Sequence, residues 1–300
     1  MKSKPYPRLK ESTQAKIALF AAALIWGSSF VMMKNAVSVF PTNMLLAIRF
    51  TIACVLLCCV FRGRLKLIDA DYLRTTALIG LCLFFAYSFQ TYGIRLTTPG
   101  KNAFLTAVYV VLVPFVYWLA IKRKPTIVNV VAAFICLGGI GLISLEPAAR
   151  TGPVGLSIGT GDALTLVGGF FYAAHIVCLA VFSRGKDPVL LTILQFAYCA
   201  LLFGINALIF EQLPPSPDVA AILTTLYLAV FCTAIAMLCQ NYGQKHTSPS
   251  SASLIMSLES VLGVAFSVWI YGESLTLRIL VGFAFVFASI IISELRPSSA

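Results

Sequence analysis

The chain has 300 residues, of which 59% are hydrophobic and 11% charged, and its formal net charge is +11. Soluble domains are close to half apolar and a quarter charged, so this composition, with a mean hydropathy of +0.93, excludes a water-soluble globular protein and indicates a polytopic membrane protein. The excess positive charge lies in the connections between apolar segments, so it indicates orientation in a membrane and not nucleic-acid binding.

Ten apolar segments follow one another along the chain. Each approaches the roughly 20 residues that a bilayer-spanning helix needs. They lie near residues 17–39, 42–61, 72–94, 100–121, 126–145, 159–182, 189–210, 219–243, 250–271 and 276–293. They are continuously apolar and do not alternate as the strands of a barrel do. We therefore predict an all-α membrane protein with ten transmembrane helices and no soluble domain.

The lysines and arginines of the connections predict the orientation. If both ends are cytoplasmic, sixteen lie on the inner side and five on the outer side, which follows the positive-inside rule. We expect cytoplasmic tails at 1–16 and 295–300 in an inner or plasma membrane. The first apolar segment is longer than the apolar part of a secretory signal, so it is expected to remain as a helix.

A ten-residue motif near the end of the third segment is repeated, with substitutions, near the end of the eighth. QTYGIRLTTP at 90–99 and QNYGQKHTSP at 240–249 share five of ten residues. The Thr-Pro and Ser-Pro endings predict capped starts of the following helices. The first segments align at an offset of 146, which pairs Trp26 with Tyr172. The chain is thus predicted to contain two five-helix units, 17–147 and 159–294, joined by a linker at 148–158.

A unit with five spans enters on one side of the membrane and leaves on the other, so its second copy is inverted. Inverted repeats of this kind are common in secondary transporters, where the solute site lies near the bilayer midplane between the repeats. The alternative is that duplication is simply an economical way to build a large membrane protein. We interpret the repeat as a sign of transport by alternating access.

Several stretches resemble the drug/metabolite transporter superfamily, in its EamA-type branch. They are WGSSFVMMKNAV (26–37), IRF (48–50), TTPGKNAFLTAVYVVLVPF (97–115) and SLESVLGVAFSVWIYGESLT (257–276). Their order and spacing cover nearly the whole chain, in two EamA units. The resemblance implies a ten-helix exporter of small metabolites, often amino acids or related compounds, with a polar cavity between its halves.

Two charged residues are predicted inside the apolar segments, where each costs on the order of 2.5–3.5 kcal/mol. Glu259 lies ~14 Å into the ninth segment, near the midplane. It is a candidate for binding an amino group or carrying a proton, or else is a structural carboxylic acid. Arg49 lies ~12 Å deep in the second segment. Depth alone permits an ion pair with Glu259, and the alternative is bonding to backbone carbonyls of the first or third segment.

Other polar or aromatic residues are candidates for a solute cavity. His175 in the sixth segment is a candidate for proton coupling with Glu259, although a lone histidine in an apolar helix is commonly an interhelical hydrogen-bonding group. Aromatic and amide groups suit the stacking and hydrogen bonding of small zwitterions, or else they fill helix interfaces. These further candidates are Trp26, Gln90, Asn102, Tyr109, Tyr172 and Gln240.

The string GTGD at 159–162 matches a pattern of intramembrane aspartyl proteases. That chemistry needs a second aspartate in a neighbouring span, and the sequence offers none, so Asp162 is interpreted as a helix cap. Glu273, followed by Ser274 and Thr276, is interpreted as capping before the tenth helix. The nine cysteines show no metal-ligand or disulfide pattern, so no metal and no cofactor is predicted.

These observations predict a secondary active exporter of small organic metabolites, first among them amino acids or related compounds. An alternative within transport is a proton-coupled exporter of hydrophobic cations that uses Glu259 as its exchanging acid. The alternative from another class is an intramembrane enzyme. The predicted partners are a small solute and the lipid bilayer, with protons as a candidate coupling ion and no nucleic acid.

Overall fold

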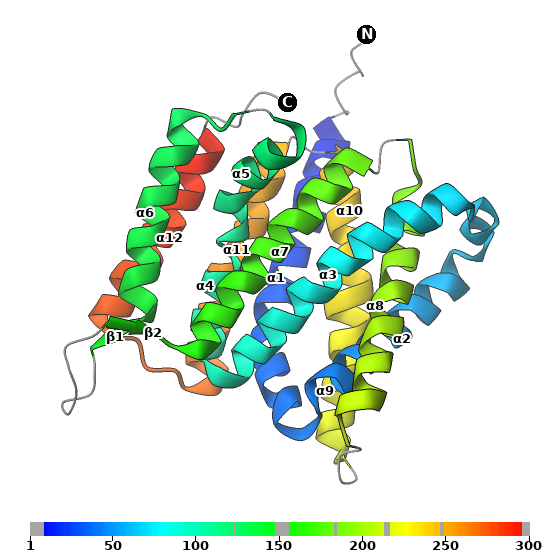
Figure 1. Ribbon diagram of the computed structural model, residues 1–300, viewed down its shortest axis with the longest axis horizontal. Helices are drawn as coiled ribbons and strands as arrows, with labels where there is room; N and C mark the ends of the chain where they lie inside the picture. The colour runs from blue at the N-terminus through cyan, green and yellow to red at the C-terminus, as the bar shows by residue number, and fades with distance from the viewer. Residues whose placement is uncertain are drawn as a thin grey trace.

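The computed structural model describes residues 9–122, 124–147, 156–182, 185–212, 217–246 and 249–295. Residues 148–155 of the predicted linker, half of the N-terminal tail and most of the C-terminal tail lie outside these residues. The same is true of Thr247 and Ser248, which were predicted as caps. The described chain is a bundle of long helices, with one pair of short strands beside the linker (Figure 1). The predicted all-helical membrane class is confirmed.

Helices of the first half follow the apolar segments. They are α1 (Leu9–Val39), α2 (Thr42–Val60), a 3₁₀ turn (Arg62–Leu67), α3 (Ala70–Leu96), α4 (Pro99–Thr106), α5 (Tyr109–Ile121) and α6 (Ile127–Ser144). The fourth apolar segment is thus divided between α4 and α5. Thr98 caps α4 by accepting a hydrogen bond from the backbone of Lys101 at 3.3 Å, and Pro99 occupies the first turn, as the Thr-Pro signal predicts.

The second half contains a comparable series. It consists of α7 (Thr160–Phe182), α8 (Pro188–Phe210), α9 (Val219–Ala229), a π-helical segment (Val230–Ile235), α10 (Ala236–His246), α11 (Pro249–Phe266), a second π-helical segment (Ser267–Tyr271) and α12 (Leu277–Leu295). Strands β1 (Leu145–Pro147) and β2 (Leu156–Ile158) pair antiparallel between the halves. The sequence did not predict this ladder, because three-residue strands are too short to show an alternating pattern.

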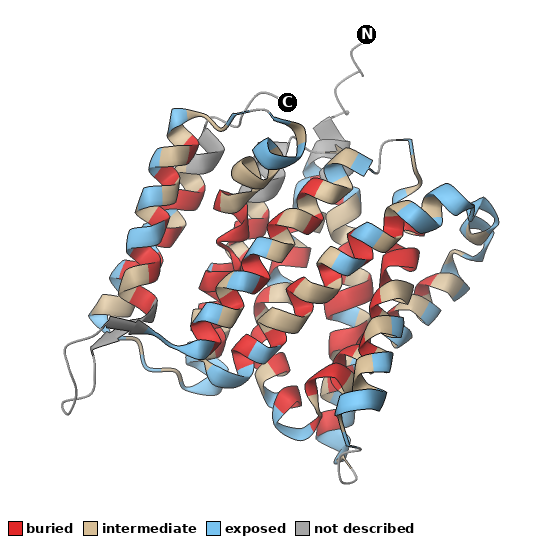
Figure 2. Ribbon diagram, in the orientation of Figure 1, coloured by how far each residue is buried: buried red, intermediate tan, exposed pale blue. Residues whose placement is uncertain are grey.

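Seven helical stretches of the described chain are long and apolar enough to cross a membrane. Three more apolar helices are shorter: Ile127–Ile143, Ile255–Tyr271 and Leu277–Ile292. They coincide with the predicted fifth, ninth and tenth segments. The chain is therefore a multi-pass membrane protein. Figure 2 shows buried residues between the helices and exposed ones on the outside of the bundle, where exposed apolar residues such as Leu208 and Phe134 suit contact with lipid.

Helices of the two halves pack against one another in matching pairs. α3 lies along α7, and α10 lies along α1; α1 packs on α11, and α7 packs on α4 and α5. The pairs α2 with α8 and α6 with α12 each join a helix to its equivalent in the other half. If each helix in these contacts is replaced by its equivalent in the other half, the same set of contacts results. In Figure 1, α1 runs downward and α7 upward, so these equivalent helices run in opposite directions.

Close approach of α3 and α7 depends on glycine. A Cβ added to Gly168 in α7 would lie 2.9 Å from the backbone nitrogen of Gln90 in α3. A Cβ at Gly93 in α3 would lie 2.8 Å from the carbonyl oxygen of Gly161. Small residues at such crossings let helix backbones approach in a membrane. This contact brings the polar face of α3 to the centre of the bundle.

Candidate functional site

A cavity lies at the centre of the bundle between the two halves. Its envelope, counted to its mouth, is about 780 Å³, which is within the usual range for a small-molecule site. Residues from α1, α2, α3, α4, α5, α7, α10 and α11 line it. All nine candidates from the sequence lie on its wall: Trp26, Arg49, Gln90, Asn102, Tyr109, Tyr172, His175, Gln240 and Glu259. Their roles in binding or coupling remain predictions.

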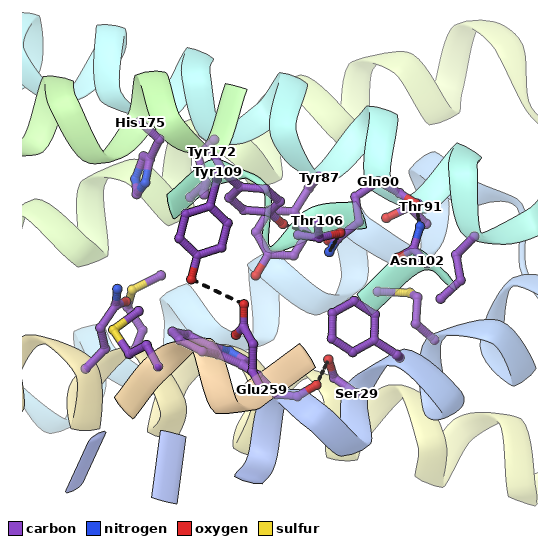
Figure 3. A pocket seen from close by; sticks show the side chains of 18 of the residues that line it. Ser29, Tyr87, Gln90, Thr91, Asn102, Thr106, Tyr109, Tyr172, His175 and Glu259 are labelled. Atoms are coloured by element: carbon purple, nitrogen blue, oxygen red, sulfur yellow. Dashed lines mark hydrogen bonds between the residues drawn. The ribbon is translucent and has the colours of Figure 1, made fainter. Parts of the chain in front are cut away.

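Glu259 projects into this cavity from α11 and is buried. The hydroxyl of Tyr109 donates to Glu259 Oε1 at 3.3 Å (Figure 3). Tyr109 is the first residue of α5, directly after the interruption of the fourth segment. Tyr109 and Glu259 are 150 residues apart and occupy equivalent positions in the two halves. The carboxyl group therefore meets a phenol from the other half, and no basic side chain of the described residues forms an ion pair with it.

Arg49 is buried on α2, and its guanidinium bonds to the second half of the chain. Its Nε donates to Thr233 Oγ1 at 2.5 Å, and one Nη donates to the carbonyl of Cys232 at 3.3 Å. The guanidinium also lies over the Tyr87 ring, 5.0 Å from its centroid. The Arg49–Glu259 ion pair that depth alone permits is absent. Arg49 instead bonds to a backbone carbonyl, as the alternative expected, but that carbonyl belongs to the eighth segment and not to the first or third. Depth placed both charges near one level but did not fix the direction in which either helix face points.

The π-helical segment explains why these groups are available to Arg49. The backbone N–H of Ala236 donates to the carbonyls of Phe231 and Thr233, whereas an α-helix would direct it to Cys232. The Cys232 carbonyl instead accepts from Trp26 Nε1 at 2.9 Å and from Arg49. Wide turns of this kind often occur at functional sites. No proline or glycine lies in Val230–Ile235, so the sequence contains no signal for it.

Amide and hydroxyl groups form a polar network on the α3 wall of the cavity. Tyr172 donates its hydroxyl proton to Gln90 Oε1 at 2.7 Å, and Gln90 Nε2 donates to Thr106 Oγ1 at 3.1 Å. Asn102 Nδ2 donates to Thr165 Oγ1 at 2.7 Å and to the carbonyl of Gln90 at 3.3 Å. The network joins α3, α4 and α7, so it includes residues of both halves. It fixes the side chain of Gln90 beside the cavity.

The cavity wall also includes His175, Gln240, Tyr87 and Thr91. His175 on α7 is buried, and its Nε2 lies 2.8 Å from Gln195 Oε1 on α8, which is the interhelical hydrogen bond foreseen as the alternative to proton coupling. Gln240 lines the cavity from α10, and no hydrogen bond of its side chain to another described residue is present. Tyr87 and Thr91 were missed by sequence reasoning, although both are polar residues within an apolar segment.

Comparison with known proteins decides the family. The model of the EamA-like transporter family matches residues 14–145 and again 159–295. The chain belongs to the EamA-like transporter family. It is 31% identical to an uncharacterised transporter of Archaeoglobus fulgidus over 94% of this chain and 86% of that protein. It is 26% identical to the uncharacterised inner membrane transporter YedA of Escherichia coli over 86% and 83% of the two chains.

A solved structure has the same fold as this EamA-like transporter. It is a protein crystal structure that superposes with a TM-score of 0.64 at 18% identity, covering 94% of this chain and 97% of that chain. At this coverage the likeness extends over both halves. At this identity it establishes the architecture and carries no information on the transported solute.

Two acidic residues, Glu273 and Asp162, tie the two halves of the transporter together where α4 and α7 begin, at the lower end of these helices in Figure 1. Glu273 accepts from the backbone of Gly100 at 3.0 Å and also from the hydroxyls of Thr98 and Ser267. It therefore stabilises the start of α4, and its predicted role as a cap of the tenth helix is wrong. Thr276, which belongs to the same predicted group, does cap α12, because its hydroxyl accepts from Ile279 N at 3.3 Å. A carboxylate is favourable at either helix start, so sequence position alone was ambiguous.

Asp162 also bonds across the halves. It lies in the first turn of α7 but accepts from Thr97 Oγ1 at 2.5 Å and lies 3.8 Å from Lys101 Nζ. It is thus a tie between α7 and the α3–α4 junction, and the prediction of a simple helix cap is wrong. Within the ranges that the structure describes, no three histidine, cysteine or acidic side chains are grouped to hold a metal ion.

Proposed function

We propose that this EamA-like transporter is a secondary active exporter of small organic metabolites, with amino acids or related compounds as its first substrate class. Ten helices, arranged as two inverted five-helix repeats, alternate the access of the central cavity between the two sides of the membrane. Both termini are cytoplasmic in this proposal. The conserved packing pattern on exchange of the halves supports the inverted arrangement.

The contact between Tyr109 and Glu259 is the observation that carries the proposal. Residues in equivalent positions of two inverted repeats touch each other only where they lie near the axis that relates the repeats. Secondary transporters bind solutes at the interface of such repeats, near the midplane. The pair joins α5 to α11 across a cavity to which both halves contribute. A solute held there contacts both moving parts.

Charge in the cavity supports a zwitterionic solute. The cavity wall holds a buried guanidinium, Arg49, and a buried carboxyl group, Glu259, that are not bonded to each other. The hydrogen bonds of Arg49 use Nε and one Nη, which leaves donors for a carboxylate. Glu259 is a partner for an ammonium group. The rings of Trp26 and Tyr172 supply the apolar and stacking surface between them.

A hydrophobic-cation exporter is the second candidate, because Glu259 is the one acidic residue among those that line the cavity. Replacement of Arg49 by Gln distinguishes the two. Export of a zwitterion should fall strongly in that variant because its carboxylate loses a partner, whereas export of a hydrophobic cation should be maintained or rise. For the enzyme alternative, Asp162→Asn would abolish a protease activity but leave a transporter with weakened helix contacts.

The proposal is tested with purified protein in liposomes, screened against a metabolite pool that includes amino acids, with and without a pH gradient. We expect transport of at least one zwitterionic compound, and we expect Glu259→Gln to reduce it by at least about tenfold, equivalent to 1.4 kcal/mol of lost interaction. Glu211→Gln is the matched control. Glu211 lies outside the cavity, at the start of α2, where its Oε1 accepts from Asn43 and its Oε2 from Met44. The amide oxygen of Gln can keep the Asn43 bonds, and the substitution loses the Met44 bond.

Unchanged transport and unchanged pH dependence in Glu259→Gln would remove this carboxyl group from the mechanism. Loss of transport in both the Glu259 and the Glu211 variants would point to a general requirement for acidic residues and would also contradict the proposed role. The amount of folded protein in each preparation is checked by gel filtration before reconstitution.

A further inference from the structure

Two buried oxygen atoms on the cavity wall have no hydrogen-bond partner. Among the described residues, Thr91 Oγ1 and Asn102 Oδ1 are the buried side-chain polar atoms in this condition. Thr91 is 1% exposed and Asn102 is 0% exposed. Native proteins satisfy nearly all such groups, and an unsatisfied one at a cavity calls for an explanation. Both residues line the central cavity.

The local geometry leaves both oxygens unpaired. Asn102 Nδ2 donates to Thr165 Oγ1 and to the carbonyl of Gln90, so both amide hydrogens are used and Oδ1 is directed elsewhere. Asn102 thus bonds to the backbone of the residue before Thr91, and both Thr91 and Asn102 line the cavity where the end of α3 meets the start of α4. Figure 3 shows Thr91 and Asn102 beside Gln90, away from His175.

We propose that Thr91 and Asn102 form a recess that binds a neutral hydrogen-bond donor of the transported solute, either a primary amide or a hydroxyl group. Both atoms are uncharged oxygens that accept hydrogen bonds. An ammonium group there would be buried beside neutral oxygens, without the carboxylate partner that a buried charge needs. The recess deepens the proposed function and rests on it: Arg49 and Glu259 hold the zwitterionic end of the solute, and the recess selects its side chain.

The second repeat does not reproduce this recess. The positions 150 residues later hold Asn241 and Ala252. Asn241 Nδ2 donates to Thr192 Oγ1 at 2.7 Å, and alanine has no polar side-chain atom. The unpaired oxygens are therefore not a consequence of the repeated architecture. They give the cavity a chemically distinct end, as selection among solutes of similar size requires.

The test uses reconstituted protein and two pairs of amino acids of similar shape: L-glutamine with L-methionine, and L-threonine with L-valine. We expect the donor-bearing member of at least one pair to be preferred about fivefold or more in kcat/KM. A preference within the glutamine pair alone assigns an amide, and one within the threonine pair alone assigns a hydroxyl. Thr91→Val should reduce the preference to below about twofold, and Thr91→Ser should retain it.

Thr76→Val is the matched control for Thr91→Val. Thr76 is also buried on α3, but its hydroxyl donates to the carbonyl of Tyr72 at 2.6 Å and lies outside the cavity. This variant should keep the wild-type preference. The recess is overturned if Thr91→Val and the wild type discriminate equally within both pairs, or if Thr76→Val removes the preference as completely as Thr91→Val does.

Thermal unfolding in detergent provides a readout that does not depend on transport. Donor-bearing compounds should raise the unfolding temperature of the wild type more than their partners do, because bound ligand stabilises the folded state. If neither amino-acid pair is transported while other compounds are, the proposed substrate class fails. In that case, equal thermal shifts within each pair overturn the recess, and unequal shifts that disappear in Thr91→Val support it.

Discussion

Buried Arg49 shows how a single residue connects the two halves of this transporter. Its guanidinium is held by Thr233, by the Cys232 carbonyl and by the Tyr87 ring. A lysine ammonium could not reproduce this planar set of contacts, since it lacks both the fork of donors and the flat face. The charge itself would be preserved in such a substitution. Arg49→Lys therefore separates geometry from charge.

We expect Arg49→Lys to lower the free energy of unfolding by about 1–3 kcal/mol, the usual cost of leaving buried polar groups without partners. Thermal or denaturant unfolding in detergent measures this. Arg64→Lys is the control, because Arg64 is 53% exposed in its ion pair with Asp187, and such surface pairs contribute roughly 0–1 kcal/mol. Equal stability of the two variants would show that the guanidinium contacts do not stabilise the bundle.

The sequence was sufficient to recognise which charged residues line the cavity, but not to predict the groups to which they bond. Glu259 and Arg49 were recognised because charges in an apolar segment are rare, and both line the cavity. Their partners could not be foreseen, since Thr233 lies 184 residues from Arg49. A depth argument gives the height of a side chain in the membrane but not its rotation about the helix axis. Depth therefore permitted an ion pair between Arg49 and Glu259, although the two side chains do not bond to each other.

At the scale of helices, local signals predicted starts better than interruptions. Pro99 and the Thr98 cap define the beginning of α4, as the sequence suggests. Neither Ala107 and Val108 nor Val230–Ile235 contains a glycine or proline, so the sequence at these places gives no local signal for the interruption or for the π-helical turn. At the π-helical turn, the carbonyl released from the helix bonds to Trp26 and Arg49 of distant helices. These two irregular places are also where Tyr109 and the Cys232 carbonyl become available to the site.

The contact of α3 with α7 offers a test of motion between the halves. Cys82 Sγ and Cys178 Sγ lie 3.9 Å apart across this contact. A variant that retains only these two cysteines should form a disulfide when an external oxidant such as copper phenanthroline accepts the two electrons. If the halves move against each other during transport, this bond should reduce the transport rate by at least about tenfold, and dithiothreitol should restore it.

A Cys82→Ser version of that variant is the control and should be insensitive to the oxidant. Complete disulfide formation, verified by mass spectrometry, together with a full transport rate would contradict movement at this contact. In that case the α3–α7 pair would be a fixed part of the protein. The opening of the cavity would then have to involve other helices.

At the scale of the whole molecule, the repeated sequence motif and the helix packing both relate the first half of the chain to the second. Residues 90–99 end α3 and begin α4, and the equivalent residues 240–249 end α10 and begin α11. The two halves contribute matching helices to a shared cavity. In the proposed arrangement, five spans per half invert the second copy. Alternating access by exchange of conformations between the halves depends on this inversion.

Side-specific labelling of two equivalent positions tests the inversion most directly. Leu96 ends α3 and His246 ends α10, and each is replaced singly by cysteine in a background without native cysteines. In intact cells, a membrane-impermeant maleimide should label Leu96→Cys from outside and should label His246→Cys only after permeabilisation. Labelling of both positions from the same side would contradict two inverted repeats and, with them, the proposed mechanism of transport.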